Sequence, residues 1–261
     1  MHYTFFAQTD PGRSRSNNED AVVFDEGTHL GVLADGMGGY NAGEVASGMA
    51  TEFIRAELSA WLAKAGAQAD KLQMRQAIEM CVNNANAAIL DAANTNAHYS
   101  GMGTTLVVGV FHGDRLLLGH MGDSRCYRLR GDTLTQITRD HSLLQEQLDA
   151  GLLTAEEAAL SPHKNLVTRA LGVEAGVVLE LNEHLLEPDD IYLMCSDGLS
   201  DMMNDVQIAG TLRQRAALSV MANHLVAQAN DNGGRDNIAV LLTRVASNPE
   251  KSGLIFRWLG K

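Results

Sequence analysis

The chain is poor in cysteine and proline. Its 261 residues include three cysteines, Cys81, Cys126 and Cys195, which lie far apart and form no CxxC pair. Such an odd, scattered set argues against a disulfide framework and a zinc site, and it favours a reducing, cytoplasmic location. Four prolines and no low-complexity linker indicate one domain, over residues 1–246, followed by a short tail at 247–261.

Basic residues and long apolar runs are also scarce. Twenty Lys and Arg against 32 Asp and Glu leave a net charge of −12, which argues against a nucleic-acid or anionic membrane partner and suits cation binding. No apolar run approaches the ~20 residues of a membrane span, and "MHYTFFAQTD" lacks a signal-peptide pattern, so no stable membrane insertion is expected. The tail "SGLIFRWLGK" is expected to pack on its own domain, with docking on a partner or membrane surface as the alternative.

Short apolar runs typical of β-strands cover both ends and the middle of the chain. Many are rich in Val, Ile, Leu, Thr or Tyr and are bounded by Gly, Asp or Asn. The runs cover residues 3–9, 21–25, 29–34, 104–112, 115–121, 126–130, 133–138, 177–186, 190–196 and 237–245. Gly113 and Asp114 alone separate two of them, which predicts a hairpin, and similar short connections predict mainly antiparallel sheets.

Three helical patterns lie between the strands. Asn41 precedes Glu44 by three residues, as in a capping box. The apolar residues that follow at helical spacing are Val45, Met49, Phe53 and Ile54, with Ala42, Ala46 and Ala50 alongside. A second helix is predicted over about 71–94, with the inward residues Leu72, Ile78, Val82, Ala85 and Ile89, and a third over about 215–230. Because strands follow strands and helices follow helices along the chain, the sequence predicts an α+β fold, with two sheets face to face and helices outside.

Residues 139–165 interrupt the strand rhythm with two short helical patterns. The segment is either a surface excursion between strands or a mobile flap beside a site, since insertions near sites often play that part. The residues alone leave both alternatives open.

The segment Asp35-Gly36-Met37-Gly38-Gly39 places a carboxylate and bare backbone directly after an apolar strand. By itself it favours a tight turn over a close approach of a ligand to the backbone. Acidic residues, however, recur at the ends of other predicted strands. They are Glu19, Asp20, Asp123, Asp197 and Asp236. Together these residues would gather carboxylates at one rim of the sheet sandwich.

Carboxylates gathered in this way repel one another. Two unit charges 4 Å apart interact by ~4 kcal/mol at the effective dielectric of a protein surface, so several pairs would consume much of a domain's stability unless a cation lay among them. Oxygen-only ligands favour Mg²⁺ or Mn²⁺, and the exposed carbonyl of Gly36 could join Asp35 as a ligand. Two such ions would ready a water for attack on phosphorus, while Arg15 offers a guanidinium fork for phosphate oxygens.

The ordered motifs of the whole chain resemble those of the bacterial PPM (type 2C) metal-dependent Ser/Thr protein phosphatases. The matching segments are TDPGRSRSNNEDA, VLADGMGGYNAGEVAS, SGMGTTLVV, GHMGDSRCYRL, ITRDHSLL, NLVTRALG, MCSDGLSD and GGRDNIAVLL. Any one of them alone is a weak signal, whereas all of them in this order are very specific. The resemblance implies a four-layer αββα sandwich with a binuclear Mn²⁺ or Mg²⁺ centre.

The resemblance also implies roles for single residues. Asp35 would bridge two metal ions, and the carbonyl of Gly36 would bind one of them. Asp197 and Asp236 would hold the other ion, and Asp123 would help to hold a third, weaker one.

For the catalytic group, the resemblance implies that Arg15 binds the substrate phosphate, and that Glu19 and Asp20 orient metal-bound waters. It matches residues 139–165 to the family's flap, which favours a substrate-facing role. We expect Asn237 to secure the Asp236 turn, and Thr104 and Thr105 to line the floor of the site mainly as core residues.

Two positions depart from the family pattern. Met37 stands where eukaryotic relatives carry a histidine proposed as general acid, and many bacterial relatives also have Met there. A metal-bound water is therefore a candidate donor of the proton to the leaving oxygen. His141 is a weaker candidate, for which a structural role is favoured, and the other eight histidines show no ligand spacing. Tyr40 replaces a histidine common in bacterial members, which predicts that the activity is tuned differently rather than lost.

The leading prediction is a phosphatase for phosphoserine and phosphothreonine in proteins, opposing a Ser/Thr kinase and acting on phosphorylated partners that include the kinase or its targets. One alternative is a non-catalytic phosphoprotein-binding module, but no implied metal ligand is missing. Another is a hydrolase of small phosphate esters, although the chain has neither a P-loop nor a GxGxxG motif.

Overall fold

The computed structural model describes residues 1–38, 42–66, 69–154, 157–158 and 166–247. The strands are β1 His2–Asp10, β2 Asp20–Asp25, β3 Leu30–Met37, β4 Gly103–Thr104, β5 Leu106–His112, β6 Arg115–Met121, β7 Arg125–Arg130, β8 Thr133–Gln136, β9 Glu180–Leu185, β10 Ile191–Cys195 and β11 Ile238–Ala246. The helices are α1 Ala42–Ala65, α2 Lys71–Thr95, η2 Ala97–Tyr99, α3 Leu143–Asp149, α5 Asp197–Ser200, α6 Asp205–Leu212 and α7 Leu218–Asp231.

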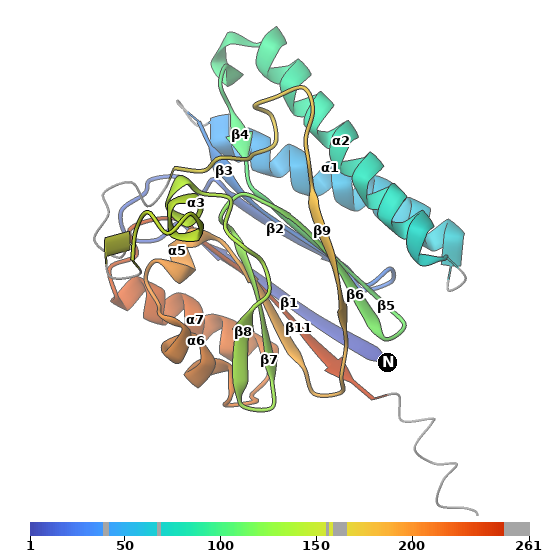
Figure 1. Cartoon of the computed structure of the whole chain (residues 1–261), viewed down its shortest axis with the longest axis vertical. Helices are drawn as coiled ribbons and strands as arrows, with labels where there is room; N and C mark the ends of the chain where they lie inside the picture. Colours follow the sequence, from blue (N-terminus) through green and yellow to red (C-terminus); the bar gives the residue numbers. More distant parts are fainter. Residues whose placement is uncertain (39–41, 67–68, 155–156, 159–165, 248–261) are drawn as a thin grey trace, which may run out of the picture.

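The strands form two sheets that pack face to face between two layers of helices (Figure 1). One sheet has the order β1-β11-β10-β7-β8, and the other has the order β2-β3-β5-β6-β9 with β4 paired to β3. Neighbouring strands pair antiparallel throughout the described part of both sheets. The predicted α+β fold with four αββα layers is therefore confirmed.

Three apolar cores correspond to the three interfaces between these layers. Residues such as Leu33, Phe111 and Tyr192 fill the space between the two sheets. The helices α1 and α2 pack on the sheet that contains β3, and α6 and α7 pack on the sheet that contains β11. Alternate side chains of each strand thus face a sheet or a helix layer, and the strand ends remain free to carry polar residues.

The strand predictions hold closely, including the hairpin in which His112 pairs with Arg115 across Gly113 and Asp114. Gly113 has a φ of 65°, in the left-handed region that a glycine enters without strain. The third helix begins at Leu218 rather than at 215, because Arg215 has a φ of 50° and cannot continue a right-handed helix.

The predicted inward face holds for the first long helix and needs one correction in the second. Leu72 is 64% exposed, and Met74 takes the buried position in the first turn of α2. In α1, the alanines Ala46 and Ala50 are buried with Ile54, and the larger apolar residues expected with them pack partly buried against the same core. The small side chains let α1 approach the sheet closely.

Three predictions fall on residues outside the described part of the chain. They are the Asn41 cap of the first helix, the role of Tyr40, and the packing of the tail. Among the described residues, no helix is both long and apolar enough to cross a membrane. Cys81, Cys126 and Cys195 are all buried free thiols.

Candidate metal centre

Four aspartates that are distant in sequence come together at one rim of the sandwich. Asp35 lies near the end of β3, and Asp20 opens β2 directly opposite it in the antiparallel pair. Asp197 begins α5 just after β10, and Ser196 Oγ donates a 2.6 Å hydrogen bond to Asp20 Oδ2. This bond joins the rims of the two sheets, so the predicted gathering of carboxylates is present.

Asp236 completes the group from the turn before β11, and two glycines make its position possible. A Cβ on Gly12 would lie 2.2 Å from Asp236 O, and one on Gly198 would lie 1.9 Å from Asn237 O. Side chains at either position would push the turn away from the rim. The sequence motifs contain both glycines, but only the structure reveals this reason for them.

Asn237 ties this turn to the N-terminal segment. Its Nδ2 donates to Pro11 O at 3.0 Å and to Asn17 O at 2.8 Å, and its Oδ1 accepts from Glu19 N at 2.8 Å. Because all three contacts are with backbone atoms, Asn237 holds the chain around Asp236 and Glu19 in register. The arrangement agrees with the predicted structural role.

Burial and neighbouring negative charges raise the pKa of three of these aspartates. Burial raises the pKa of Asp35 well above its ordinary value, and the charges of Asp20 and Asp197 add to this effect. Burial likewise raises the pKa of Asp20 to about 7, partly offset by the hydroxyl of Ser196. Burial and the charge of Asp123 raise the pKa of Asp197. Since each ionised group resists the ionisation of the next, the cluster favours any cation placed among them.

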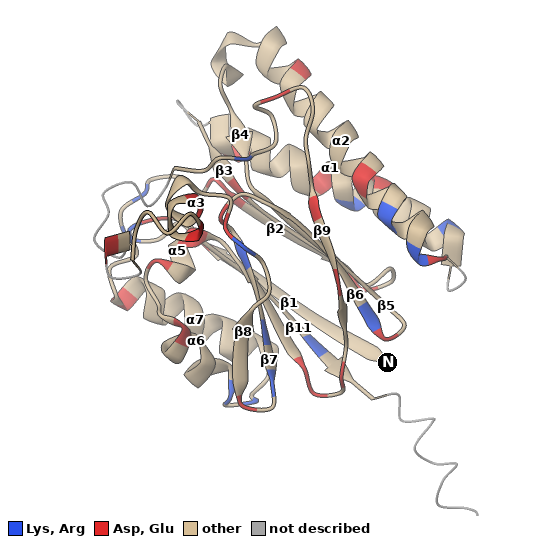
Figure 2. Ribbon diagram, in the orientation of Figure 1, with Lys and Arg blue, Asp and Glu red and all other residues tan. Residues whose placement is uncertain are grey.

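The donor set fits a hard divalent cation. Acidic residues gather where the end of β3 meets α5 (Figure 2). Asp20 Oδ1 is buried and has no hydrogen-bond donor among the described residues, although a buried carboxylate oxygen normally has one. Carboxylate and carbonyl oxygens without a thiolate are the ligands that Mg²⁺ and Mn²⁺ prefer.

Gly36 has a second reason to be glycine. Its N–H donates to Glu19 O at 3.0 Å, and a Cβ on it would lie 2.1 Å from Gly43 O in the first turn of α1. Gly43 faces the same restriction, because its own Cβ would lie 2.7 Å from Glu19 Oε2. The two glycines therefore let α1, β3 and the Glu19 turn meet at the rim.

Thr104 and Thr105 support Asp35 through hydrogen bonds rather than by core packing alone. Thr104 Oγ1 donates to Asp35 O at 2.8 Å, and Thr105 Oγ1 accepts from Asp35 N at 3.0 Å. Thr105 Oγ1 also lies 2.7 Å from Ser124 Oγ. These contacts extend the support of Asp35 to the turn that carries Asp123, a connection that the sequence did not reveal.

Arg15 lies at the exposed side of the centre. Its Nη2 is 2.7 Å from Asp236 Oδ2, and the Arg15 side chain is 51% exposed. The charge of Asp236 raises the pKa of the Arg15 guanidinium, with a smaller contribution from Glu19. Glu19 Oε1 accepts from Asn17 Nδ2 at 3.0 Å. Of the predicted catalytic residues, Asp20 is thus one of the clustered aspartates, while Arg15 and Glu19 border them and Arg15 is open to solvent.

Asp123 follows β6 on the other side of the cluster and is nearly buried. Burial raises the pKa of Asp123 to about 6, helped by the charge of Asp140 and opposed by that of Arg125. Arg125 is engaged with Asp140 through bonds of 2.6 to 3.0 Å, and the charge of Asp123 acts on both Asp35 and Asp197.

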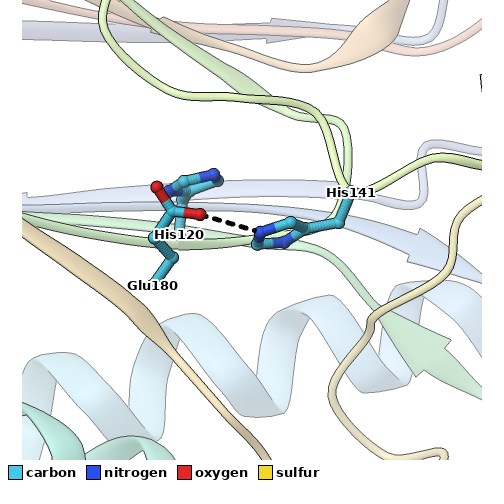
Figure 3. Close-up of side chains that lie close together, drawn as sticks. All are labelled: His120, His141 and Glu180. Carbon is cyan, nitrogen blue, oxygen red and sulfur yellow. Dashed lines mark hydrogen bonds and ion pairs between the residues drawn. The ribbon is translucent and has the colours of Figure 1, made fainter. Parts of the chain in front are cut away.

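A second group of metal-ligand residue types lies beside the Asp123 turn. His120, His141 and Glu180 each offer a ligand atom, and these atoms lie within 4.8 Å of one another. Figure 3 shows the two imidazoles stacked, with Glu180 reaching the ring of His141. The residues come from β6, the start of the flap and β9, so no local spacing could have revealed the group. His141 is buried and hydrogen-bonded, which agrees with the structural role that the sequence favoured for it.

Comparison with known protein families gives one match over most of the chain. The family model described as protein phosphatase 2C matches residues 11–242. The serine/threonine phosphatase stp of Listeria welshimeri is 37% identical over 245 residues, which are 93% of this chain and 95% of the relative.

Solved structures agree with the family match. The serine/threonine phosphatase PstP/Ppp of Mycobacterium tuberculosis has a TM-score of 0.85 and 37% identity, covering 95% of this chain and 100% of that one. A catalytic domain of the phosphatase PstP in complex with two manganese ions has a TM-score of 0.80 and 37% identity, covering 94% of this chain and 99% of that one.

Proposed function

The chain belongs to the protein phosphatase 2C family and is a metal-dependent serine/threonine protein phosphatase, and we propose that the clustered aspartates of the candidate metal centre are its ligands. Asp35 would bridge two Mn²⁺ or Mg²⁺ ions, with the Gly36 carbonyl on one and with Asp197 and Asp236 on the other. Asp123 would help to hold a third, weaker ion. The support is the raised pKa of Asp35 and Asp197, to which burial and the charges of neighbouring aspartates contribute, and which a cation held among them would lower.

The ions would lower the pKa of a water molecule and so supply a nucleophile for in-line attack on phosphorus. Arg15, half-exposed beside Asp236, would grip two phosphate oxygens with its planar fork. Glu19 and Asp20 would orient water at the centre, since both carry acceptor oxygens at the rim.

The proton for the leaving serine or threonine oxygen would come from water. Met37 carries no transferable proton, and His141 is buried with its Nε2 bonded to Glu180 at 3.2 Å. Neither side chain is therefore suited to act as the general acid, which must reach the leaving oxygen.

We further propose that residues 1–246 form a single phosphatase domain, and that the flap of about 139–165 faces the substrate. The protein substrates would include a Ser/Thr kinase or its targets, so that the enzyme opposes the kinase. Three buried free thiols support a cytoplasmic location, because thiols persist in a reducing compartment.

The metal assignment is tested with a phosphothreonine peptide. Activity should require Mn²⁺ or Mg²⁺, vanish with a chelator and fall more than about 100-fold in Asp35→Asn, since even residues that only support a ligand cost about 10–100-fold. Asp236→Asn should behave likewise. Asp190→Asn is the matched control, because Asp190 lies at the opposite end of β10 and should leave turnover by folded enzyme intact. Metal-dependent turnover that persists in both rim variants would refute the assignment.

A comparison of substrates separates the remaining alternatives. Phosphopeptides should be hydrolysed in preference to nucleotides and small phosphate esters at equal concentration. A preference for nucleotides would favour the small-ester hydrolase. The absence of turnover at saturating Mn²⁺ would favour a phosphoprotein-binding module.

A further inference from the structure

The group formed by His120, His141 and Glu180 has the residue types of a metal site, but its hydrogen bonds decide against one. Gly122 N–H donates to His141 Nδ1 at 3.2 Å, so Nδ1 carries the lone pair. His141 Nε2 then carries the proton and donates it to Glu180 Oε2 at 3.2 Å. Arg169 Nη1 is 3.5 Å from the same nitrogen, at the limit of hydrogen bonding. A neutral imidazole so arranged has no free lone pair for a metal ion.

The geometry of the two rings supports the same conclusion. His120 and His141 stack with centroids 4.7 Å apart and planes at 8°. Since the lone pairs of an imidazole lie in its plane, two parallel rings cannot direct them at one point between the planes. His120 Nε2 lies 2.8 Å from the carbonyl of Arg139, which can only accept. Both histidines therefore act as hydrogen-bonding groups.

His141 lies where the two ends of the flap meet. Leu143 N donates to Leu166 O at 2.9 Å, and Thr168 N donates to His141 O at 2.8 Å. Ser142 and Val167 pair as an antiparallel bridge between these bonds. The base of the flap is thus a short ladder with His141 at its inner end.

The same residue holds the turn that leads to Asp123. His141 N donates to Gly122 O at 2.8 Å, while its side chain accepts from Gly122 N. Gly122 has a φ of 99°, and a Cβ on it would lie 2.6 Å from Thr105 Cγ2. The turn is therefore held between Thr105, which also binds the backbone of Asp35, and His141.

We propose that His141 is a positioning residue whose Nδ1 lone pair holds the Gly122–Asp123 turn and thereby sets the affinity for a divalent ion at Asp123. Glu180 orients the ring by accepting from Nε2–H, and His120 supports it by stacking. His141 therefore contacts both the base of the flap and the turn that carries Asp123. The proposal rests on the assignment of Asp123 as a ligand in the proposed function.

The tautomer is the most direct test. Nitrogen-15 spectra of the histidine side chains in the metal-free protein should show His141 protonated at Nε2 and bare at Nδ1. Addition of Zn²⁺ as a probe at one equivalent should leave this signature unchanged if rim sites are first filled with Mg²⁺. A proton on Nδ1, or a zinc-induced shift of His141 and His120 together, would overturn the proposal in favour of a histidine metal site.

Substitutions test the effect on metal affinity. His141→Leu removes the acceptor and should raise the Mn²⁺ concentration for half-maximal activity about tenfold, the lower range for residues that support a ligand. His141→Asn places Oδ1 near the position of Nδ1 and should restore the wild-type value within about threefold. Glu180→Gln still accepts from Nε2–H and should also stay near wild type. Equal losses in the Leu and Asn variants would indicate a merely structural role and contradict the proposal.

Asp123→Asn distinguishes a failure of the Asp123 ligand assignment from a failure of the positioning role of His141. It should show the same rise in required Mn²⁺ as His141→Leu, and the double variant should lose no more than either single one. If Asp123→Asn leaves the Mn²⁺ dependence unchanged, the ligand assignment fails. If Asp123→Asn raises it and His141→Leu does not, the assignment holds and the positioning role of His141 is wrong.

Discussion

Asp190 and Asp197 flank the two ends of strand β10, and the charges around them differ in sign. Asp190 is 1% exposed and accepts from Arg130 Nε at 2.9 Å and from Arg130 Nη2 at 2.7 Å. Asp197 instead feels the negative charges of Asp123, Asp201 and Asp236. One end of the strand is thus balanced by Arg130, while acidic groups crowd the other end, where the proposed function places a cation from solution.

This difference separates folding from function. A buried carboxylate that serves only the fold is paired, because an unpaired buried charge is strongly destabilising. A cluster of like charges is destabilising until a ligand fills it, so its persistence indicates a ligand. Four predictions follow from the contrast between the Asp190 end and the Asp197 end.

The first concerns the pH dependence of the metal-free protein. Burial raises the pKa of Asp20 to about 7 and that of Asp123 to about 6, whereas an unfolded aspartate titrates near ~3.9. Groups with a raised folded pKa contribute stability that is complete below the unfolded pKa and is lost as pH rises through the folded one. The free energy of unfolding in chelator should therefore fall by on the order of 3 kcal/mol from pH 5 to pH 8.

Urea denaturation at both pH values provides the measurement, and Asp20→Asn should flatten the slope. Saturating Mn²⁺ should reverse the trend, because metal ions bind the deprotonated ligands. A metal-free protein whose stability is constant or rises between pH 5 and pH 8 would contradict the clustering of the charges.

The second concerns stabilisation by metal. An ion that binds only the folded state should add ~2.7 kcal/mol to the free energy of unfolding at a hundred times its dissociation constant. Melting curves should shift upward with Mn²⁺ in the wild type and in Asp190→Asn, but much less in Asp35→Asn. Equal shifts in all three proteins would place the binding site elsewhere.

The third concerns the Asp190 end of β10, where loss of the carboxylate should change the free energy of unfolding in the opposite direction to its loss at Asp35. Asp190→Asn removes the partner of Arg130 and should lower the free energy of unfolding by about 2 kcal/mol, less than the ~3–5 kcal/mol of a fully buried pair. The reduction is expected because Arg130 is partly exposed and keeps Glu187 at 2.7 Å. In chelator at pH 8, Asp35→Asn should instead stabilise. If denaturation shows both variants destabilised equally, the two ends of β10 do not differ as described.

The fourth compares the two arginines. The Arg15–Asp236 pair is exposed on the Arg15 side, and exposed pairs contribute ~0–1 kcal/mol. Arg15→Ala should therefore barely change the melting temperature but raise KM for a phosphopeptide about tenfold, because one hydrogen-bonded charge pair with substrate is lost. Arg130→Ala should lower the melting temperature and leave KM unchanged. An unchanged KM in Arg15→Ala would remove Arg15 from the phosphate site.

The sequence predicted the strands and the aspartates well because both depend on local pattern. Asp35 and Asp197 follow apolar runs whose period and length identify strands, and their order along the chain matches a known family. The gathering of these aspartates at one rim could be inferred from the positions of the strand ends, without knowledge of side-chain contacts.

Features that depend on close packing could not be predicted in the same way. Leu72 fits the helical period but is exposed, and Met74 takes the buried position in the same turn of α2. The short helices α5 and α6 are fewer than nine residues each and too short for a clear periodicity. The His120–His141–Glu180 contact joins three separate segments, and the clash that keeps Gly36 and Gly43 as glycine appears only when α1 meets β3.

The central claim is that cations hold the rim aspartates together. Anomalous diffraction at the manganese edge, from crystals grown with Mn²⁺, tests it most directly. We expect two strong peaks between Asp35, Asp197 and Asp236, with a weaker third near Asp123. Peaks elsewhere, or aspartates that point apart with no ion between them, would contradict it.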